Sequence, residues 1–163
     1  MLKHMTPQRA AFIVFIVTAA TLAGAWIFEY YGYAPCELCL KQRWAYHIAI
    51  PLSLALGLLS TNNPALARRG LYVLALVMLG SAIFGAYHAG VEWKWWPGPD
   101  TCSGDGGLSG GLPDLTKPAV MCDRPAIRIL GLSLAGWNGV ISLALAIVAL
   151  KGATSHGSSS VSQ

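Results

Sequence analysis

The stretch Pro35-Cys36-Glu37-Leu38-Cys39-Leu40-Lys41-Gln42-Arg43 lies between two apolar runs and holds two cysteines three positions apart. Two thiols at this spacing can close a small disulfide ring and reopen it with little movement of the backbone. If the following run is a helix that begins near Cys39, the helix dipole and Arg43, four residues on, both favour a thiolate at Cys39. The stretch therefore predicts a reactive sulfur at the edge of a membrane.

The composition around this stretch is that of a membrane protein. Of the 163 residues, 55% are hydrophobic and only 11% are charged, which argues against a soluble globular domain. Four apolar runs are each about as long as a helix needs to cross a bilayer, and they cover residues 10–28, 44–60, 71–90 and 130–150. The predicted fold is an all-α membrane protein, a single four-transmembrane-helix bundle over residues 1–151. Its loops cover residues 29–43 and 91–129, and residues 152–163 are expected to be a disordered tail.

The charged residues divide by side of the membrane. With four spans, the termini and the middle link share one side, which carries five basic residues and no acid: Lys3, Arg9, Arg68, Arg69 and Lys151. Because basic residues in short segments stay inside, both termini are expected to be cytoplasmic and all four cysteines outside, where disulfides persist. The net charge of +4 is then a sign of topology, and we expect no nucleic-acid partner.

The first apolar run has a second interpretation. Lys3 and Arg9 precede it, as basic residues precede the apolar core of a cleavable signal peptide. The apolar residues continue through Phe28, further than such a core usually extends. We therefore expect an uncleaved span with the tail residues 152–163 on the same side.

The four cysteines form a close pair, Cys36 and Cys39, and a distant pair, Cys102 and Cys122. A structural disulfide is a good reading of the distant pair, because closing a loop of about twenty residues removes roughly 3 kcal/mol of unfolded-state entropy. The ring of the close pair is too small to stabilise much, so reactivity explains it better. A zinc site built from all four is disfavoured by their spacing and by the oxidising compartment, and no metal is predicted.

A reactive disulfide on the outer face needs an electron acceptor, and the chain has neither a Gly-rich nucleotide loop nor a haem motif. A quinone fits, because it dissolves in the membrane, accepts two electrons and has carbonyl oxygens that Arg43 could hydrogen-bond. His88, expected at a depth similar to that of Arg43, has two interpretations. It is an interfacial histidine satisfied by a carbonyl or water, or it is a donor to the quinone that Glu92 could orient.

Further features accompany the motif at Pro35 to Arg43. They are the four spans with both termini inside, the second cysteine pair in a long outer loop, and Gly131-Leu132-Ser133 leading to Trp137-Asn138. Together these features resemble the family of the bacterial disulfide bond formation protein DsbB, over nearly the whole chain. The resemblance implies a four-helix oxidase of the bacterial inner membrane. Such a protein passes electrons from a reduced DsbA-like periplasmic protein of thioredoxin fold to ubiquinone or menaquinone in the membrane quinone pool.

The resemblance also implies a role for each cysteine. Cys102 would be attacked by the partner's thiolate and form the mixed disulfide, and Cys122 would be its pair. Cys36 would exchange with the loop cysteines, and Cys39 would be the thiolate facing the quinone, with Arg43 stabilising it or the ring. The short, Gly-rich segment between Cys102 and Cys122 departs from the family pattern, which leaves a specialised partner open.

Two other functions fit parts of the pattern. A quinone or epoxide reductase of the vitamin K type would run the same cysteine relay, but that family usually adds a fifth span and a different motif neighbourhood. A non-enzymatic membrane scaffold or small transporter with structural disulfides would tolerate the loss of Cys36 and Cys39. The uncharged interiors of the spans argue against ion-coupled transport. A quinone-coupled thiol oxidase is the main hypothesis.

Overall fold

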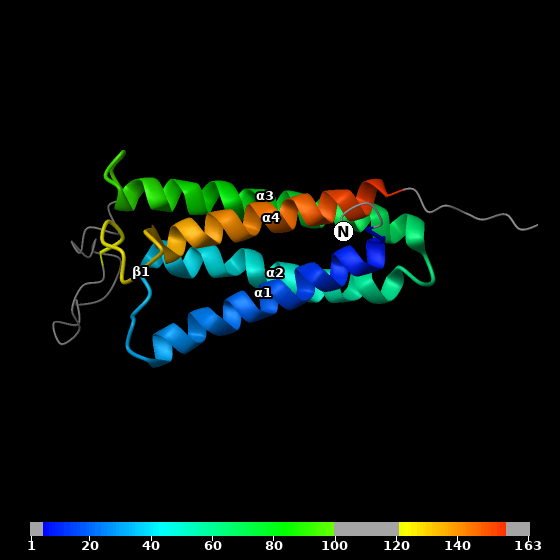
Figure 1. Ribbon diagram of the computed structural model, residues 1–163, viewed down its shortest axis with the longest axis horizontal. Coiled ribbons are helices and arrows are strands. Elements are labelled where there is room, and N and C mark those ends of the chain that lie inside the picture. The colour runs from blue at the N-terminus through cyan, green and yellow to red at the C-terminus, as the bar shows by residue number, and fades with distance from the viewer. Residues whose placement is uncertain (1–4, 100–120, 156–163) are drawn as a thin grey trace, which may run out of the picture.

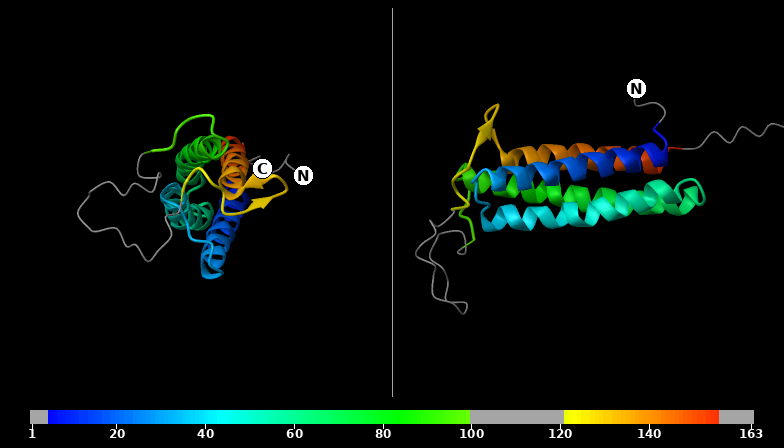
Figure 2. Two further views of the ribbon diagram at one scale, coloured as in Figure 1. Left: turned by 90° about the vertical axis from the view of Figure 1, so that its left-hand side faces the viewer. Right: turned by 90° about the horizontal axis from the view of Figure 1, so that it is seen from below.

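The computed structural model describes residues 5–99 and 121–155. In order, these residues form the helices α1 (Pro7–Tyr30), α2 (Glu37–Leu59) and α3 (Pro64–Glu92), the strands β1 (Arg128–Ile129) and β2 (Leu132–Ser133), and the helix α4 (Leu134–Thr154). Successive helices run side by side in opposite directions (Figure 1). The link between α1 and α2 and the β-hairpin lie at one end of the bundle, and the link between α2 and α3 lies at the other (Figure 2).

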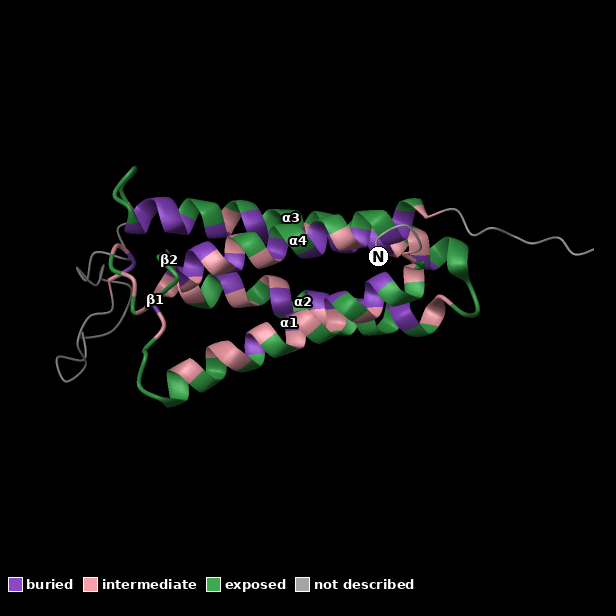
Figure 3. Ribbon diagram, viewed as in Figure 1, coloured by how far each residue is buried: buried purple, intermediate pink, exposed green. Residues whose placement is uncertain are grey.

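Three of the described helices, α1, α3 and α4, are long and apolar enough to cross a membrane. The helix α2 stands apart from them, because it carries Lys41, Gln42 and Arg43 near its start and Pro51 in its interior. Figure 3 shows buried and exposed residues alternating along every helix, so that each turns one face to the bundle and another outward. Large apolar side chains such as Ile16, Leu76 and Ile83 are exposed on the outward faces, as expected for contact with lipid. The prediction of a helical protein is thereby confirmed, with three described helices able to span a membrane, and the count of four spans stays a prediction.

A side chain caps the start of each helix. The side chains of Thr6, Asn63 and Ser133 accept a hydrogen bond from the backbone N–H three residues on, at the start of α1, α3 and α4. Such caps satisfy backbone donors that have no partner within the helix. At the start of α2 the same position is taken by a sulfur, the Sγ atom of Cys36.

The structure corrects two predicted boundaries near the ends of α4. The predicted span 130–150 begins with the hairpin instead of a helix, because Leu130 and Gly131 have φ angles of 52° and 84° and form a tight turn. The helix α4 then continues to Thr154, so the first residues of the predicted disordered tail are helical. Gly152 is buried there against α1, so closely that a Cβ atom added to it would meet Ala10. The rest of that tail lies outside the described residues.

The other helices begin before the apolar runs that predicted them. The helix α2 begins at Glu37, whereas its apolar run begins near residue 44, and α3 begins at Pro64, whereas its run begins near residue 71. Hydropathy detects only the part of a helix that lipid surrounds, while capping and backbone hydrogen bonds extend the helix into the polar edge. The early start of α2 matters most, because it brings Cys36 and Cys39 into a helix end.

The helices α3 and α4 approach each other most closely at Gly85 and Gly139. A Cβ atom added to Gly85 would lie 2.7 Å from the backbone nitrogen of Gly139. One turn away, the hydroxyl oxygens of Ser81 and Ser142 lie 3.0 Å apart and share a hydrogen bond. Small residues at such a crossing let two backbones pack directly in an apolar medium.

Replacing Gly85 by alanine is expected to push α3 and α4 apart, because the added methyl group meets backbone atoms that cannot turn aside. Overpacking of this kind costs about 1–3 kcal/mol, which should appear as a lower free energy of unfolding in a detergent titration followed by circular dichroism. Gly80→Ala on the same helix is the matched control, since its Cβ atom would meet nothing within 4 Å. Equal stability of the two variants would contradict the close packing.

Candidate redox site

Cys36 is the N-cap of α2, and Cys39 lies in the first turn of that helix. The Sγ atom of Cys36 accepts a hydrogen bond from the backbone N–H of Cys39 at 3.2 Å. Both thiols are free, and Cys36 is only 5% exposed. A sulfur in this position faces the positive end of the helix dipole, which favours the thiolate.

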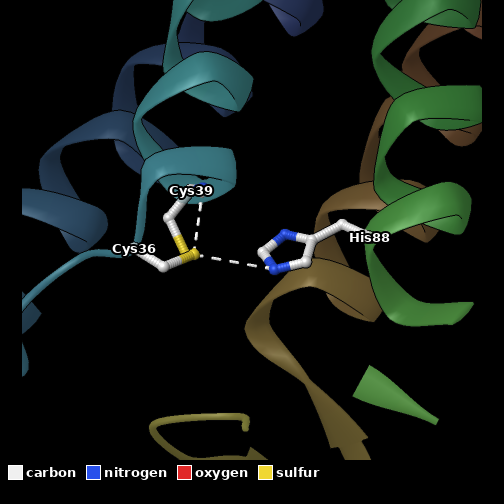
Figure 4. A group of neighbouring side chains, drawn as sticks. All are labelled: Cys36, Cys39 and His88. Atoms are coloured by element: carbon white, nitrogen blue, oxygen red, sulfur yellow. Dashed lines mark hydrogen bonds between the residues drawn. The ribbon is translucent and has the colours of Figure 1, made fainter. Parts of the chain in front are cut away.

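His88 of α3 faces the cysteine pair from the opposite helix (Figure 4). Its Nε2 atom lies 3.6 Å from the Sγ atom of Cys36, and the side-chain nitrogen of Gln42 lies 2.7 Å from its Nδ1 atom. An amide nitrogen can only donate, so Nδ1 accepts and the ring proton lies on Nε2, toward the sulfur. The carboxylate of Glu92, one turn further along α3, lies 3.9 Å from Nε2. All of these groups are buried.

The two cysteines differ in acidity. The pKa of the Cys36 thiol is lowered from its ordinary value to about 5, first because the Cys39 thiol donates a hydrogen bond to it, and then because of His88 and the backbone N–H of Cys39; burial opposes this change. The pKa of the Cys39 thiol is raised, first because its proton is held in the hydrogen bond to Cys36 and then because of burial. In the dithiol state the thiolate therefore lies on Cys36.

This result differs from the expectation of a thiolate at Cys39 supported by Arg43. The guanidinium of Arg43 pairs instead with the carboxylate of Glu29 near the end of α1, at 2.6 Å, and also reaches the carbonyl oxygen of Ala25 at 3.5 Å. The four-residue spacing does place Arg43 one turn from Cys39, but a carboxylate is a stronger partner for a guanidinium than a protonated thiol.

A cavity of about 310 Å³ opens beside Cys39, between α1, α2 and α4. Its walls are largely apolar, with aliphatic and aromatic side chains from all three helices. The lining residues with polar side-chain atoms are fewer, and they include Cys39, Gln42, Arg43, Tyr46 and Asn138. Cys36 and His88 are not among the residues that line it. The cavity therefore meets one sulfur of the pair and excludes the other.

Tyr46 and Asn138, which line this cavity, belong to a network of buried polar side chains that connects three helices. The hydroxyl of Tyr46 on α2 donates to the side-chain oxygen of Asn138 on α4 at 2.5 Å and lies 3.1 Å from the hydroxyl oxygen of Ser142. Ser142 is in turn bonded to Ser81 of α3. In an apolar bundle such a network fixes the helices relative to one another, because breaking it would leave polar groups without partners.

Cys122, in the segment before β1, lies beside Cys36. It is 1% exposed and belongs to one buried cluster with Cys36, Leu38 and Val91. Cys122 is in a disulfide, and because Cys36 and Cys39 are free, its partner lies outside the described residues. The predicted role of Cys102 falls outside the described residues as well.

The sulfurs of Cys36 and Cys39 and a ring nitrogen of His88 lie within 4.8 Å of one another. These are the ligand types of a zinc site, so the dithiol state could hold a thiophilic metal as well as carry thiol chemistry. Cys122 offers no thiolate to such a site while it is in a disulfide. The reduced sulfurs would be needed for metal binding, so oxidation of the pair would abolish it.

Sequence reasoning missed two residues of this site, Gln42 and Glu29. Gln42 lies three residues after Cys39, where a polar side chain one turn from a reactive cysteine could have drawn attention. It lines the cavity and also contacts His88, so it touches both parts of the site. Glu29 gave no such signal, because its contact with Arg43 joins two helices.

The fold and the site define a class of protein: a thiol–disulfide protein whose redox pair sits at the end of an apolar helical bundle. The model of the family described as disulfide bond formation protein DsbB matches residues 7–151. The chain therefore belongs to the DsbB family, which supports a role in disulfide bond formation and confirms the resemblance found in the sequence.

Individual relatives cover most of the chain. Disulfide bond formation protein B of Aromatoleum aromaticum is 33% identical over 156 residues, which cover 87% of this chain and 90% of that protein. Its counterpart in Azoarcus sp. is 29% identical over 147 residues, covering 84% of this chain and 86% of the relative. An uncharacterized protein of Rickettsia prowazekii is 28% identical over 143 residues, covering 83% and 81%. No solved structure matches the chain.

The difference in acidity predicts which sulfur reacts first. With a pKa of about 5, Cys36 is a thiolate above that pH and becomes protonated as the pH falls through it, whereas Cys39 stays protonated. We expect iodoacetamide to label Cys36 before Cys39 in the reduced protein at neutral pH, with a rate that falls below about pH 5. Fragment-ion mass spectrometry assigns the label, with urea-unfolded protein as the control. Labelling of Cys39 before Cys36 would contradict the placement of the thiolate on Cys36.

Proposed function

We propose that this protein is a thiol:quinone oxidoreductase of the bacterial inner membrane. It reoxidises a DsbA-like periplasmic dithiol protein through its cysteine pairs and passes the electrons to ubiquinone or menaquinone. Membership of the DsbB family supports the role in disulfide formation, and the geometry of the site supports the two ends of the relay.

One observation carries the proposal: the two sulfurs of the pair face different surroundings. Cys36 lies inside a buried cluster with the loop cysteine Cys122, whereas Cys39 is packed against that cluster and also lines the apolar cavity, which Cys36 does not reach. A pair placed in this way can receive electrons on one side and release them on the other. A purely structural disulfide between Cys36 and Cys39 would need neither the cavity nor Cys122 beside it.

The residues around the cavity fit a quinone. A bound quinone would supply a two-electron acceptor that takes up two protons on becoming a quinol. The apolar walls suit a ring and a lipid-like tail, and the cavity volume of about 310 Å³ is within the range of ligand sites. Arg43 and Gln42 both line it and offer N–H donors to a ring oxygen, with Glu29 holding Arg43 in place. Cys39 is the sulfur next to these donors.

The relay then runs in two exchanges. A thiolate at Cys122, released when the partner attacks Cys102, attacks Cys36 of the Cys36–Cys39 disulfide, and the electron pair of that bond leaves on Cys39. The Cys102 thiolate, freed as the partner completes its own disulfide, then attacks Cys122. The Cys36–Cys122 bond breaks, and its electron pair leaves on Cys36. The products are a loop disulfide and a reduced Cys36–Cys39 pair.

The charges support an orientation with the site on the periplasmic side. The end of the bundle opposite the site holds the start of α1, the link before α3 and the end of α4. The basic residues Arg9 and Lys151 lie near the start of α1 and the end of α4, Arg68 and Arg69 lie near the start of α3, and the described part of the chain has no acid at this end. Basic residues in short segments favour the cytoplasm. In the proposed topology α2 also spans the membrane, which brings the number of spans to four, and both termini are cytoplasmic.

Quinone reduction by the purified protein tests this function. On adding a reduced DsbA-like protein, we expect the ultraviolet absorbance of ubiquinone or menaquinone to show one quinone reduced per partner disulfide formed. Cys39→Ala and Cys102→Ala should each reduce the rate to background, because each breaks the relay at a different end. Reduction that persists in either variant, or none with either quinone in the unaltered protein, would overturn the proposal and favour structural disulfides.

Filling the cavity tests where the quinone binds. Gly24 of α1 lines the cavity, and a Cβ atom added to it would meet nothing within 4 Å, so Gly24→Leu adds a side chain at the cavity wall with room for its first carbon. Loss of even 1.4 kcal/mol of quinone binding would raise the KM for quinone about tenfold, while exchange between the protein's cysteines and the DsbA-like protein is unaffected. Gly80→Leu, on an exposed face of α3, is the control. An unchanged KM in Gly24→Leu would place the quinone elsewhere.

A further inference from the structure

We propose that His88 is a catalytic hydrogen-bond donor to Cys36, held in its Nε2–H tautomer by Gln42, and that it makes Cys36 the leaving sulfur in exchange with the loop cysteines. The inference rests on the proposed function and deepens it. It assigns His88 to the thiol exchange, because its Nε2 atom lies 3.6 Å from Cys36 and it is absent from the cavity lining.

The step concerned is the second exchange of the relay. The attacking Cys102 thiolate forms a new S–S bond with Cys122, the Cys36–Cys122 bond breaks, and the electron pair of that bond leaves on Cys36. No proton or outside oxidant is needed, since one thiolate is consumed and one is released. A thiol leaves faster as its pKa falls, so a donor aimed at the departing sulfur accelerates this step.

Among the described residues, the state of the cysteines is the one expected after this step. Cys36 and Cys39 are free, Cys122 is in a disulfide, and Cys36 lies in the same buried cluster as Cys122. The Sγ atom of Cys36 accepts from the backbone N–H of Cys39 on one side and faces Nε2 of His88 on another. At 1% exposure His88 is shielded from solvent, and a hydrogen bond from its N–H to the sulfur is stronger there than in water.

Gln42 is the positioning residue in this arrangement. Its amide nitrogen lies 2.7 Å from Nδ1 of His88 and can only donate, which leaves the ring proton on Nε2. The opposite tautomer would bring two donors together at Nδ1 and present a lone pair to the thiolate. A side chain without the amide would free the ring to take either form.

Other charged groups act on His88 and Cys36 from the neighbouring elements. Glu92, on the next turn of α3, lies 3.9 Å from Nε2, and its negative charge helps to keep the proton there when Cys36 is in a disulfide. Cys39 donates to Cys36 from α2, and Arg128 of β1 acts electrostatically on Glu92. The dependence of Cys36 reactivity on pH therefore reflects Cys39, Glu92 and Arg128 as well as His88.

The test compares the pH midpoint of Cys36 alkylation in the reduced, full-length protein. His88→Leu removes the donor and is expected to raise the midpoint by about one unit, a tenfold loss of thiolate below it. His88→Gln keeps an N–H donor and should restore part of the shift, while Gln42→Leu should give a smaller rise. His47→Gln is the control, because His47 lies further along α2 against Trp26 and Trp44. A midpoint in folded His88→Leu equal to that of the unaltered protein would overturn the proposal.

A second measurement needs no substitution at His88. Nitrogen-15 shifts of histidine-labelled protein report which ring nitrogen carries the proton, and the His88 signals are those that change in Gln42→Leu. We expect protonated Nε2 and unprotonated Nδ1; the opposite assignment would overturn the proposal. Neither experiment uses a quinone or a partner protein, so its failure is distinct from failure of the quinone assay.

Discussion

The close contact between α3 and α4 is the constraint on which the site depends. Gly85 and Gly139 bring the two backbones together, and the neighbouring Asn138 is hydrogen-bonded across to Tyr46 of α2. Three helices are thereby fixed within a few residues of the pair. His88 follows Gly85 by one turn on α3, so its reach toward Cys36 is set by the same crossing. A looser crossing would separate the ring from the sulfur and expose polar groups that the bundle cannot satisfy otherwise.

The polar groups of the site are divided between two sulfurs that are only three residues apart. The sulfur of Cys36 lies at the N-terminus of α2, accepts hydrogen bonds from the thiol and the backbone N–H of Cys39, and faces the imidazole N–H of His88. These contacts stabilise negative charge on Cys36. Cys39 keeps its proton and faces an apolar cavity, together with a guanidinium whose charge is already balanced by a carboxylate. The lowered pKa and the contact with the apolar cavity thus belong to different cysteines. Gln42 touches both parts, because it lies in the cavity wall and holds the imidazole.

Most of the fold, and the placement of Cys36 and Cys39 together at one end of the bundle, could be predicted from the sequence because hydropathy and spacing are local signals. The helical bundle, the pair and the family all follow from them. The partner of Arg43 could not be predicted, since its contact with Glu29 depends on how α1 and α2 converge. The hairpin was hidden inside an apolar run, because only the φ angles of Leu130 and Gly131 distinguish it from a helix. The location of the thiolate likewise depends on a histidine that lies far away in the chain.

Cys36 is the cap of α2 and, in the proposed relay, also the sulfur that exchanges partners, so the relay would link local backbone structure to redox state. In the dithiol form its Sγ atom satisfies the backbone N–H of Cys39. A disulfide sulfur carries no charge and has its geometry set by a second bond, so it is a weaker acceptor for that N–H. The first turn of α2 therefore loses part of its anchoring whenever the pair is oxidised. In the proposed relay, the backbone at the start of α2 would therefore differ between the dithiol and disulfide states.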